Sequence, residues 1–193
     1  MKKLLTLLIV PFLFAGCSDE KQPQLYPLNV AALVNLIGST PTQVKQSFEA
    51  IFISEAPSMS GTEMVYHLPT GDGNFEVRFF FDDNNMLQRA QAMAIIKSKM
   101  TPLDYFKAEM EKLNSTYSGK AYTGQCVGAS SILFDDRAEL WAYANQNSQE
   151  VITETWHLKS GEQNGSERVY QTIGGTYNKP SNSILIESSR TVR

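Results

Sequence analysis

The chain has 193 residues, a hydrophobic content of 42 % and a formal net charge of −3. This mild acidity argues against a nucleic-acid-binding protein, which needs a clustered basic surface. The length suits one domain of ordinary size, or two small halves that share a sheet. The two cysteines are too few for a disulfide framework.

Residues 1–16 have the pattern of a secretory signal peptide. Two lysines precede an apolar run over residues 4–14, and the small residues Ala15 and Gly16 follow. About eleven apolar residues span roughly 16 Å as a helix, which is about half of the hydrocarbon core of a bilayer. We therefore predict a signal peptide rather than a membrane span.

Phe14-Ala15-Gly16-Cys17 resembles the lipobox of bacterial lipoproteins, although leucine is usual where this chain has Phe14. In that family the cysteine thiol receives a diacylglycerol, the cysteine becomes the new N-terminus, and acyl chains such as palmitate anchor the protein in the membrane. The resemblance implies lipidation at Cys17. The alternative is an ordinary signal peptide cleaved near Ala15, with Cys17 unmodified.

Residues 17–28 are expected to form the lipid anchor and a tether, because this segment is polar and contains two prolines. Ser18 follows the cysteine where, in the enterobacterial sorting rule, an aspartate favours the inner membrane. The resemblance thus implies an outer-membrane lipoprotein that faces the periplasm. Removal of the two N-terminal lysines changes the net charge from −3 to −5.

Residues 29–193 are predicted to form a periplasmic α+β domain that begins with two helices. The apolar segment from Asn29 to Ile37 has the pattern of a short helix ended by Gly38. Thr40-Pro41-Thr42-Gln43 combines a capping box with proline at the first helical position, which predicts a second helix. The apolar residues of this helix recur at helical spacing and form one stripe: Val44, Phe48, Ile51 and Phe52.

Three strands should follow as an antiparallel meander. Apolar residues alternate along 63–68, 75–81 and 86–96, and turn-forming residues occupy 71–74 and 82–85. In the third run three small residues share one face, which predicts that a helix lies close to it: Ala90, Ala92 and Ala94.

The pattern then starts again with Thr101-Pro102, which predicts another helix. Its helical stripe consists of Leu103, Phe106, Met110 and Leu113. The remaining predicted elements are strands at 130–134, 139–144 and 151–158, a flexible loop at 161–166, and a final hairpin of 168–172 with 183–188.

The two halves share a short signature. Phe81-Asp82-Asp83-x-x-x-Leu87 matches Phe134-Asp135-Asp136-x-x-x-Leu140, and each follows a Thr-Pro helix start. We interpret this as a degenerate tandem repeat with halves 29–97 and 98–193. The alternative is that two unrelated hairpins use the same Asp-Asp turn. The predicted fold class is α+β, with helices packed on antiparallel meanders.

The helix start Gly38-Ser39-Thr40-Pro41-Thr42-Gln43-Val44, followed by strands around a Phe-Asp-Asp turn, resembles the small envelope lipoproteins of the BamE/SmpA type. The related β-lactamase-inhibitor-protein fold uses tandem helix-plus-meander units. The family's glycine-proline exit from this helix is missing, and residues 52–57 take its place. The resemblance implies an adaptor or inhibitor that binds proteins with its sheet.

Residue patterns for enzymes, metals and cofactors are missing from the sequence. His67 and His157 are far apart, and there is no H-E-x-x-H, C-x-x-C or G-x-S-x-G segment. The Asp-Asp pairs lack the spacing of a calcium loop and are predicted to be hairpin turns. We expect no enzymatic activity, no cofactor and no metal. Cys126 is expected to be a buried small hydrophobe, the alternatives being a reactive thiol or an intermolecular bridge.

Aromatic residues give the one signal for a binding surface. If 139–144 is a strand, Trp141 and Tyr143 share a face, and Phe80 is a neighbour on the outer side of the sheet. Because Trp and Tyr are enriched at interface hot spots, these three residues are candidate protein-binding residues. The alternative is that the alternation runs the other way and the aromatic residues face the core.

The expected function is non-enzymatic. We predict an envelope lipoprotein that is attached to the membrane by its lipid and binds an envelope protein as an adaptor or accessory subunit. An immunity or inhibitor protein against a toxin or lytic enzyme is the alternative in the same class. A lipid or small-molecule carrier is the alternative in another class, and it requires an apolar cavity of several hundred Å³ between helices and sheet.

Overall fold

The computed structural model describes residues 30–58, 61–96 and 100–193. The predicted signal peptide, the lipidation residue Cys17 and the tether lie outside these residues. Within the described residues, the helices are too short or too polar to cross a bilayer.

The described residues form one sheet of nine strands, with every neighbouring pair antiparallel and the strand order β1-β2-β3-β4-β9-β8-β7-β5-β6. The strands are β1 (Ile51–Ser58), β2 (Gly61–Pro69), β3 (Gly73–Phe81), β4 (Leu87–Ile96), β5 (Ala121–Val127), β6 (Ser131–Phe134), β7 (Val151–Asn164), β8 (Glu167–Asn178) and β9 (Ser183–Val192). The halves of the chain meet where β4 pairs with β9. The predicted α+β class with an antiparallel sheet is confirmed.

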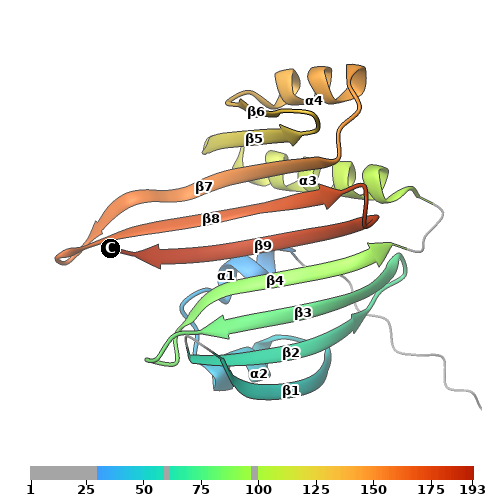
Figure 1. The fold of residues 1–193 in the computed structure, drawn as a ribbon. Helices are drawn as coiled ribbons and strands as arrows, with labels where there is room; N and C mark the ends of the chain where they lie inside the picture. The colour runs from blue at the N-terminus through green and yellow to red at the C-terminus, as the bar shows by residue number, and fades with distance from the viewer. Residues whose placement is uncertain (1–29, 59–60, 97–99) are drawn as a thin grey trace, which may run out of the picture.

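Four helices are present in the described residues: α1 (Val30–Asn35), α2 (Pro41–Ser47), α3 (Pro102–Tyr117) and α4 (Arg137–Gln146). The helix α1 contacts β4 and β9, α3 contacts β8, and α4 contacts β5 and β6. The ring of Phe48, which follows α2, lies 5.3 Å from Tyr66 and 5.0 Å from Phe79. These contacts all use the same face of the sheet, so the opposite face carries no helix of the described chain (Figure 1).

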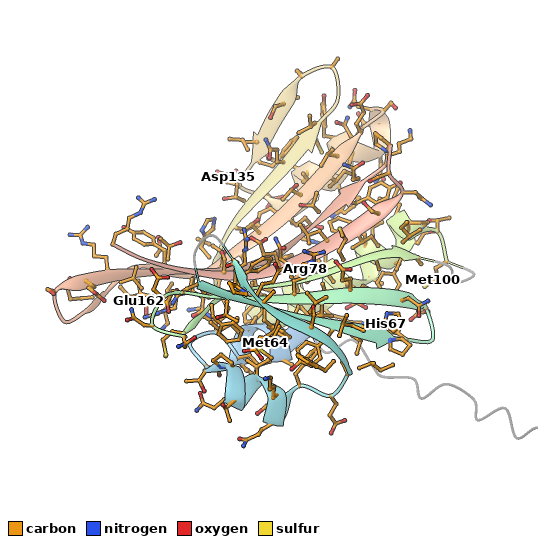
Figure 2. The ribbon with its side chains drawn as sticks, turned by 60° about the horizontal axis from the view of Figure 1, so that its bottom comes forward. Met64, His67, Arg78, Met100, Asp135 and Glu162 are labelled. Carbon is orange, nitrogen blue, oxygen red and sulfur yellow. The ribbon has the colours of Figure 1, made fainter. Side chains whose placement is uncertain are left out.

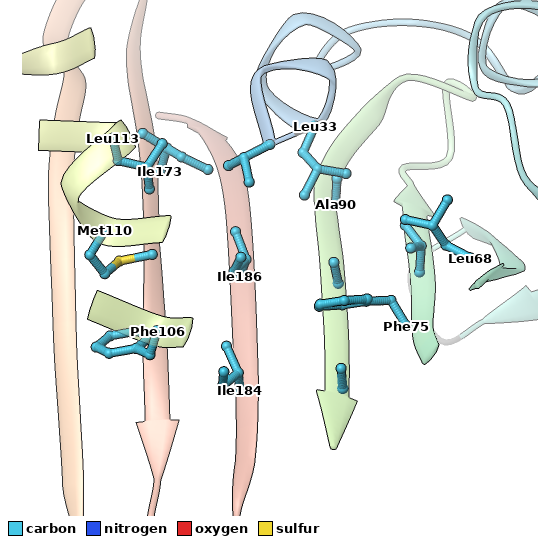
Figure 3. Packing of buried hydrophobic residues seen from close by; sticks show 14 of the residues in the cluster. Leu33, Leu68, Phe75, Ala90, Phe106, Met110, Leu113, Ile173, Ile184 and Ile186 are labelled. Atoms are coloured by element: carbon cyan, nitrogen blue, oxygen red, sulfur yellow. The ribbon is translucent and has the colours of Figure 1, made fainter. Parts of the chain in front are cut away.

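The core lies between this covered face and the helices. Side chains that alternate along the strands are buried there, as the period of two requires. The predicted alanine row is confirmed: Ala90, Ala92 and Ala94 are buried, and both α1 and α3 contact β4. Figure 3 shows Leu33 of α1 beside Ala90. The small side chains on β4 let this helix approach the sheet closely.

The second helix ends earlier than its apolar stripe predicts. The capping box at Thr40 and Gln43 forms, but α2 stops at Ser47. Ile51 and Phe52 belong to β1, because the run of β-branched and aromatic residues pairs with β2 instead of extending a short helix. Phe52 still points to the helix side, where its ring lies 5.3 Å from that of Tyr66.

The predicted strand at 139–144 is wrong, because these residues form α4. The carboxylate of Asp136 accepts a hydrogen bond of 3.0 Å from the backbone N–H of Glu139 and caps the helix. The Asp-Asp pair of the second half is therefore a helix start and not a hairpin turn. In the first half, Asp82 does close the β3–β4 turn, where it accepts a hydrogen bond from the backbone N–H of Met86.

The structure differs from the sequence prediction at three further places. The strand β5 was not predicted. The predicted flexible loop at 161–166 is largely the end of β7, with the turn at Gly165 (φ +63°). The strand β8 continues through Gly174 and Gly175, which were predicted to be outside the final hairpin strands. Cys126 is buried in β5 as a free cysteine, as expected.

The outer strands of the sheet carry features that oppose pairing with another chain. The strand β1 has an irregularity between Phe52 and Ser54, and Pro57 lacks a backbone N–H. At the other edge, β6 has only four residues. These features make the edges poor templates for a further strand, so the faces of the sheet are the better candidates for binding.

Gly174 tests the close packing of β8 against β7. A Cβ atom at Gly174 would lie 2.1 Å from the backbone oxygen of Glu154, whereas one at Gly71 would meet no atom within 4 Å. We expect Gly174→Ala to lower the free energy of unfolding by about 1–3 kcal/mol, the usual cost of overpacking. Denaturant unfolding with Gly71→Ala as the matched control measures this, and equal losses in the two variants would contradict the packing.

Candidate functional site

The structure separates the three residues predicted to form a protein-binding surface. Trp141 and Tyr143 lie on α4, where positions two apart point in nearly opposite directions. The Trp141 ring lies 6.3 Å from Phe106 of α3, and the Tyr143 ring lies 5.5 Å from Phe134 of β6. Phe80 lies on the opposite face of the sheet, because it alternates with the buried Phe79 and Phe81 of β3. The predicted shared face is therefore wrong, because it depended on a strand at 139–144.

A buried glutamate organises the helix side of the second half. Glu154 on β7 has no exposed surface and accepts three hydrogen bonds through its carboxylate. The donors are Arg137 Nε at 2.7 Å, Tyr122 Oη at 3.0 Å and Trp141 Nε1 at 3.1 Å. Sequence reasoning missed this cluster, although one signal was present: Glu154 occupies the buried face of its strand between Ile152 and Trp156.

Burial raises the pKa of Glu154 above its ordinary value of 4.5, although Arg137 and the other two donors lower it. The pKa of Tyr122 is also raised, first by burial and then by the charge of Glu154. Arg137 pairs in addition with Glu111 of α3 at 2.6 Å, so one guanidinium links α3, α4 and β7. The cluster fixes the orientation of α4 over the sheet.

A groove of about 560 Å³ lies between α3 and α4, directly above this cluster. It is lined by Lys107, Ala108, Glu111, Asn114, Arg137, Ala138, Trp141 and Asn145. The ammonium of Lys107 lies 4.7 Å from the centre of the Trp141 ring and 3.4 Å from Asn145 Oδ1. The groove opens between two helices, whereas the predicted carrier cavity would lie between helices and sheet.

The uncovered face of the sheet offers a second surface. Met93 and Ile95 point outward, alternate with the buried Ala92, Ala94 and Ile96 of β4, and are 47 % and 58 % exposed. Met93 pairs directly with Leu185 of β9, so these three side chains form an apolar patch across two strands. We call Met93, Ile95 and Leu185 the apolar patch.

Polar and charged groups surround the apolar patch. Arg78 pairs with Glu63 at 2.8 Å and with Glu76 at 2.6 Å, and Glu76 lies opposite Met93 (Arg78 is labelled in Figure 2). Phe80 lies further along β3, with the Arg89 guanidinium 4.2 Å above its ring. The half of this face formed by β7 to β9 carries paired hydroxyl groups instead: Thr153 with Thr176, and Thr172 with Ser189.

Metal-ligating side chains do not gather in groups of three or more within the described residues. His67 lies on β2 and His157 on β7, as predicted for strand histidines, and His157 is hydrogen-bonded to Thr123. No protein-family model matches the chain, and neither curated proteins nor solved structures give a significant match. The surfaces described above therefore carry the functional argument.

Arg137→Met tests the pairing of Glu154. Removing one partner of a buried ion pair leaves an uncompensated charge, and we expect the free energy of unfolding to fall by about 3–5 kcal/mol. Arg89→Met is the matched control, because Arg89 is exposed and should change stability by only about 0.5 kcal/mol. Denaturant unfolding gives both values, and a loss in Arg137→Met as small as that in Arg89→Met would refute the role of the cluster.

The raised pKa of Glu154 predicts a pH dependence. A folded-state pKa above the unfolded value means that the folded protein binds more protons, so stability falls as pH rises from about 4.5 through the folded pKa. Relative to Glu154→Gln, the wild type should lose stability as pH rises through that window. Unfolding curves at a series of pH values measure this difference.

Glu150→Gln, at an exposed position, is the control for this pH series. Its stability should change with pH in the same way as that of the wild type. If the wild type instead gained stability over Glu154→Gln as pH rose, the pairing with Arg137 would outweigh burial. The direction given for the pKa of Glu154 would then be wrong.

Proposed function

We propose that this chain is a bacterial envelope lipoprotein that binds another protein with the uncovered face of its sheet, as an adaptor or accessory subunit. The observation that carries the proposal is the one-sided arrangement of the helices: all four in the described residues cover the same face. The opposite face exposes the apolar patch in the middle of the sheet. Exposed contiguous apolar side chains rimmed by polar groups are typical of protein-binding surfaces.

The dimensions of this face suit a protein partner. Nine strands spaced about 4.8 Å apart span about 38 Å, and ten residues of strand run about 33 Å. This area exceeds the roughly 800 Å² that each partner contributes to a standard protein interface. The partner that fits is a globular protein with an apolar patch and mixed charges around it, since the outward charges of β2 and β3 have both signs.

The membrane attachment belongs to the same proposal. Cys17 would carry the lipid after cleavage of residues 1–16, and residues 17–28 would hold the domain away from an outer-membrane surface. Halves 29–97 and 98–193 would be degenerate copies of one unit of helix and antiparallel strands, with α4 inserted between β6 and β7 of the second half. This duplication is supported by the pairing of the halves through β4 and β9 and by the helices that both place on the same face.

An inhibitor or immunity protein would use the same face, and the identity of the partner distinguishes the two functions. An adaptor would bind a resident subunit of an envelope assembly. An inhibitor would bind a toxin or lytic enzyme, and its gene would be expected beside that of the toxin.

Ile95→Asp tests the proposed face. We expect this variant of the full-length, tagged protein to lose its dominant partner in crosslinking and co-purification from the bacterium that encodes it, because a carboxylate in the apolar patch is costly to bury. Ile53→Asp is the matched control, since Ile53 is 57 % exposed but lies on the edge strand β1. Loss of the partner in Ile53→Asp alone would place the interface at the sheet edge and contradict the proposal.

A further inference from the structure

We propose that the groove between α3 and α4 binds a neutral saccharide of two or three rings. This function goes beyond protein binding, because the groove lies on the helix side, opposite the uncovered face. Its volume of about 560 Å³ falls in the range of small-molecule sites, about 300–1,000 Å³. Ala108 and Ala138 place only methyl groups in the groove, which leaves room for a ring between the two helices.

Trp141 provides a rigid flat surface in this groove. Its indole N–H is held by the buried carboxylate of Glu154 at 3.1 Å, and its ring lies against Phe106. The carbon-hydrogen face of a pyranose ring is flat and weakly apolar, and it stacks well on an indole. Because the ring orientation is fixed before binding, little conformational entropy is lost when a ligand stacks on it.

The charges of the site favour a neutral ligand. Lys107, Arg137 and Glu111 line the groove, and Arg137 is already paired with Glu111 and with the buried Glu154 beneath it. An anionic ligand would meet Glu111, and a cationic ligand would meet Lys107. Neither sign of charge is favoured by this balance.

The polar rim of the groove offers both donors and acceptors of hydrogen bonds. The amides of Asn114 and Asn145 each present one acceptor and two donors, and Lys107 adds a further donor. A neutral ligand that matches this rim must donate and accept at several points around a compact ring. Sugar hydroxyl groups have this property, since each hydroxyl is both donor and acceptor.

Lys107 is placed to adjust to such a ligand. Its ammonium interacts with the Trp141 ring at 4.7 Å and with Asn145 at 3.4 Å, both of which are weak contacts. A sugar ring that enters the groove replaces the ammonium over the indole, and the flexible lysine side chain then reaches a ring hydroxyl.

The test uses tryptophan fluorescence of the folded protein with cellotriose, chitotriose and maltotriose as probes. The chain has two tryptophans, and Trp156 is only 1 % exposed, so a sugar-dependent change reports on Trp141. We expect at least one trisaccharide to give a saturable change with a dissociation constant of about 1 mM or lower. The absence of a saturable change with all three trisaccharides would overturn the proposal.

Two matched variants, each replacing an alanine of α4 by phenylalanine, locate the site. Ala138→Phe fills the groove and should weaken binding at least tenfold, whereas Ala142→Phe, exposed on the same helix but outside the lining, should bind like the wild type. Thermal unfolding checks that both variants fold, and Asn145→Ala replaces Ala138→Phe if that variant does not. Binding that is equally strong in the wild type and the groove variant would refute the assignment.

Discussion

The ladder between β4 and β9 is the constraint on which the rest of the structure depends. Seven residue pairs, from Arg89 with Ser189 to Ile95 with Ser183, join the two halves into one sheet. Without this ladder, β4 and β9 would each present an unpaired edge in the middle of the sheet. Because both halves place their helices on the same side of the ladder, one face becomes the core boundary and the other stays open.

The helix side of the second half depends on a different interaction, the burial of Glu154. One carboxylate accepts hydrogen bonds from β5 and from two residues of α4, and Arg137 extends the link to α3. A buried charge of this kind is stable only while its partners are in place, so it specifies one position of α4. The groove is held in one shape by the same interactions, because Arg137 and Trp141 both line it. The two surfaces of the molecule thus differ: the open face is broad, and the groove is formed around a Trp141 ring that Glu154 holds in place.

Sequence patterns predicted β2, β3 and β4 of the first half, the alanine row of β4 and the helix starts at Thr40 and Thr101, because each depends on local spacing. They missed β1, whose first residues continue the apolar stripe of the preceding helix. They failed for α4, since Leu140-Trp141-Ala142-Tyr143 also fits the alternation of a strand and only the Asp136 cap indicates a helix. The predicted surface of Trp141, Tyr143 and Phe80 failed with it. The Glu154 cluster joins Tyr122, Arg137 and Glu154 across 32 residues of chain, and no local spacing encodes such a long-range contact.

We propose above that the open face of the sheet contacts a partner protein in the envelope. Site-specific photocrosslinking in living cells tests it most directly, with the reactive group introduced in turn at Met93, Leu185 and, on the helix side, Ala142. We expect a crosslink to one dominant protein from Met93 and Leu185 and none from Ala142. A dominant protein crosslink from Ala142 with none from the two sheet positions would contradict it.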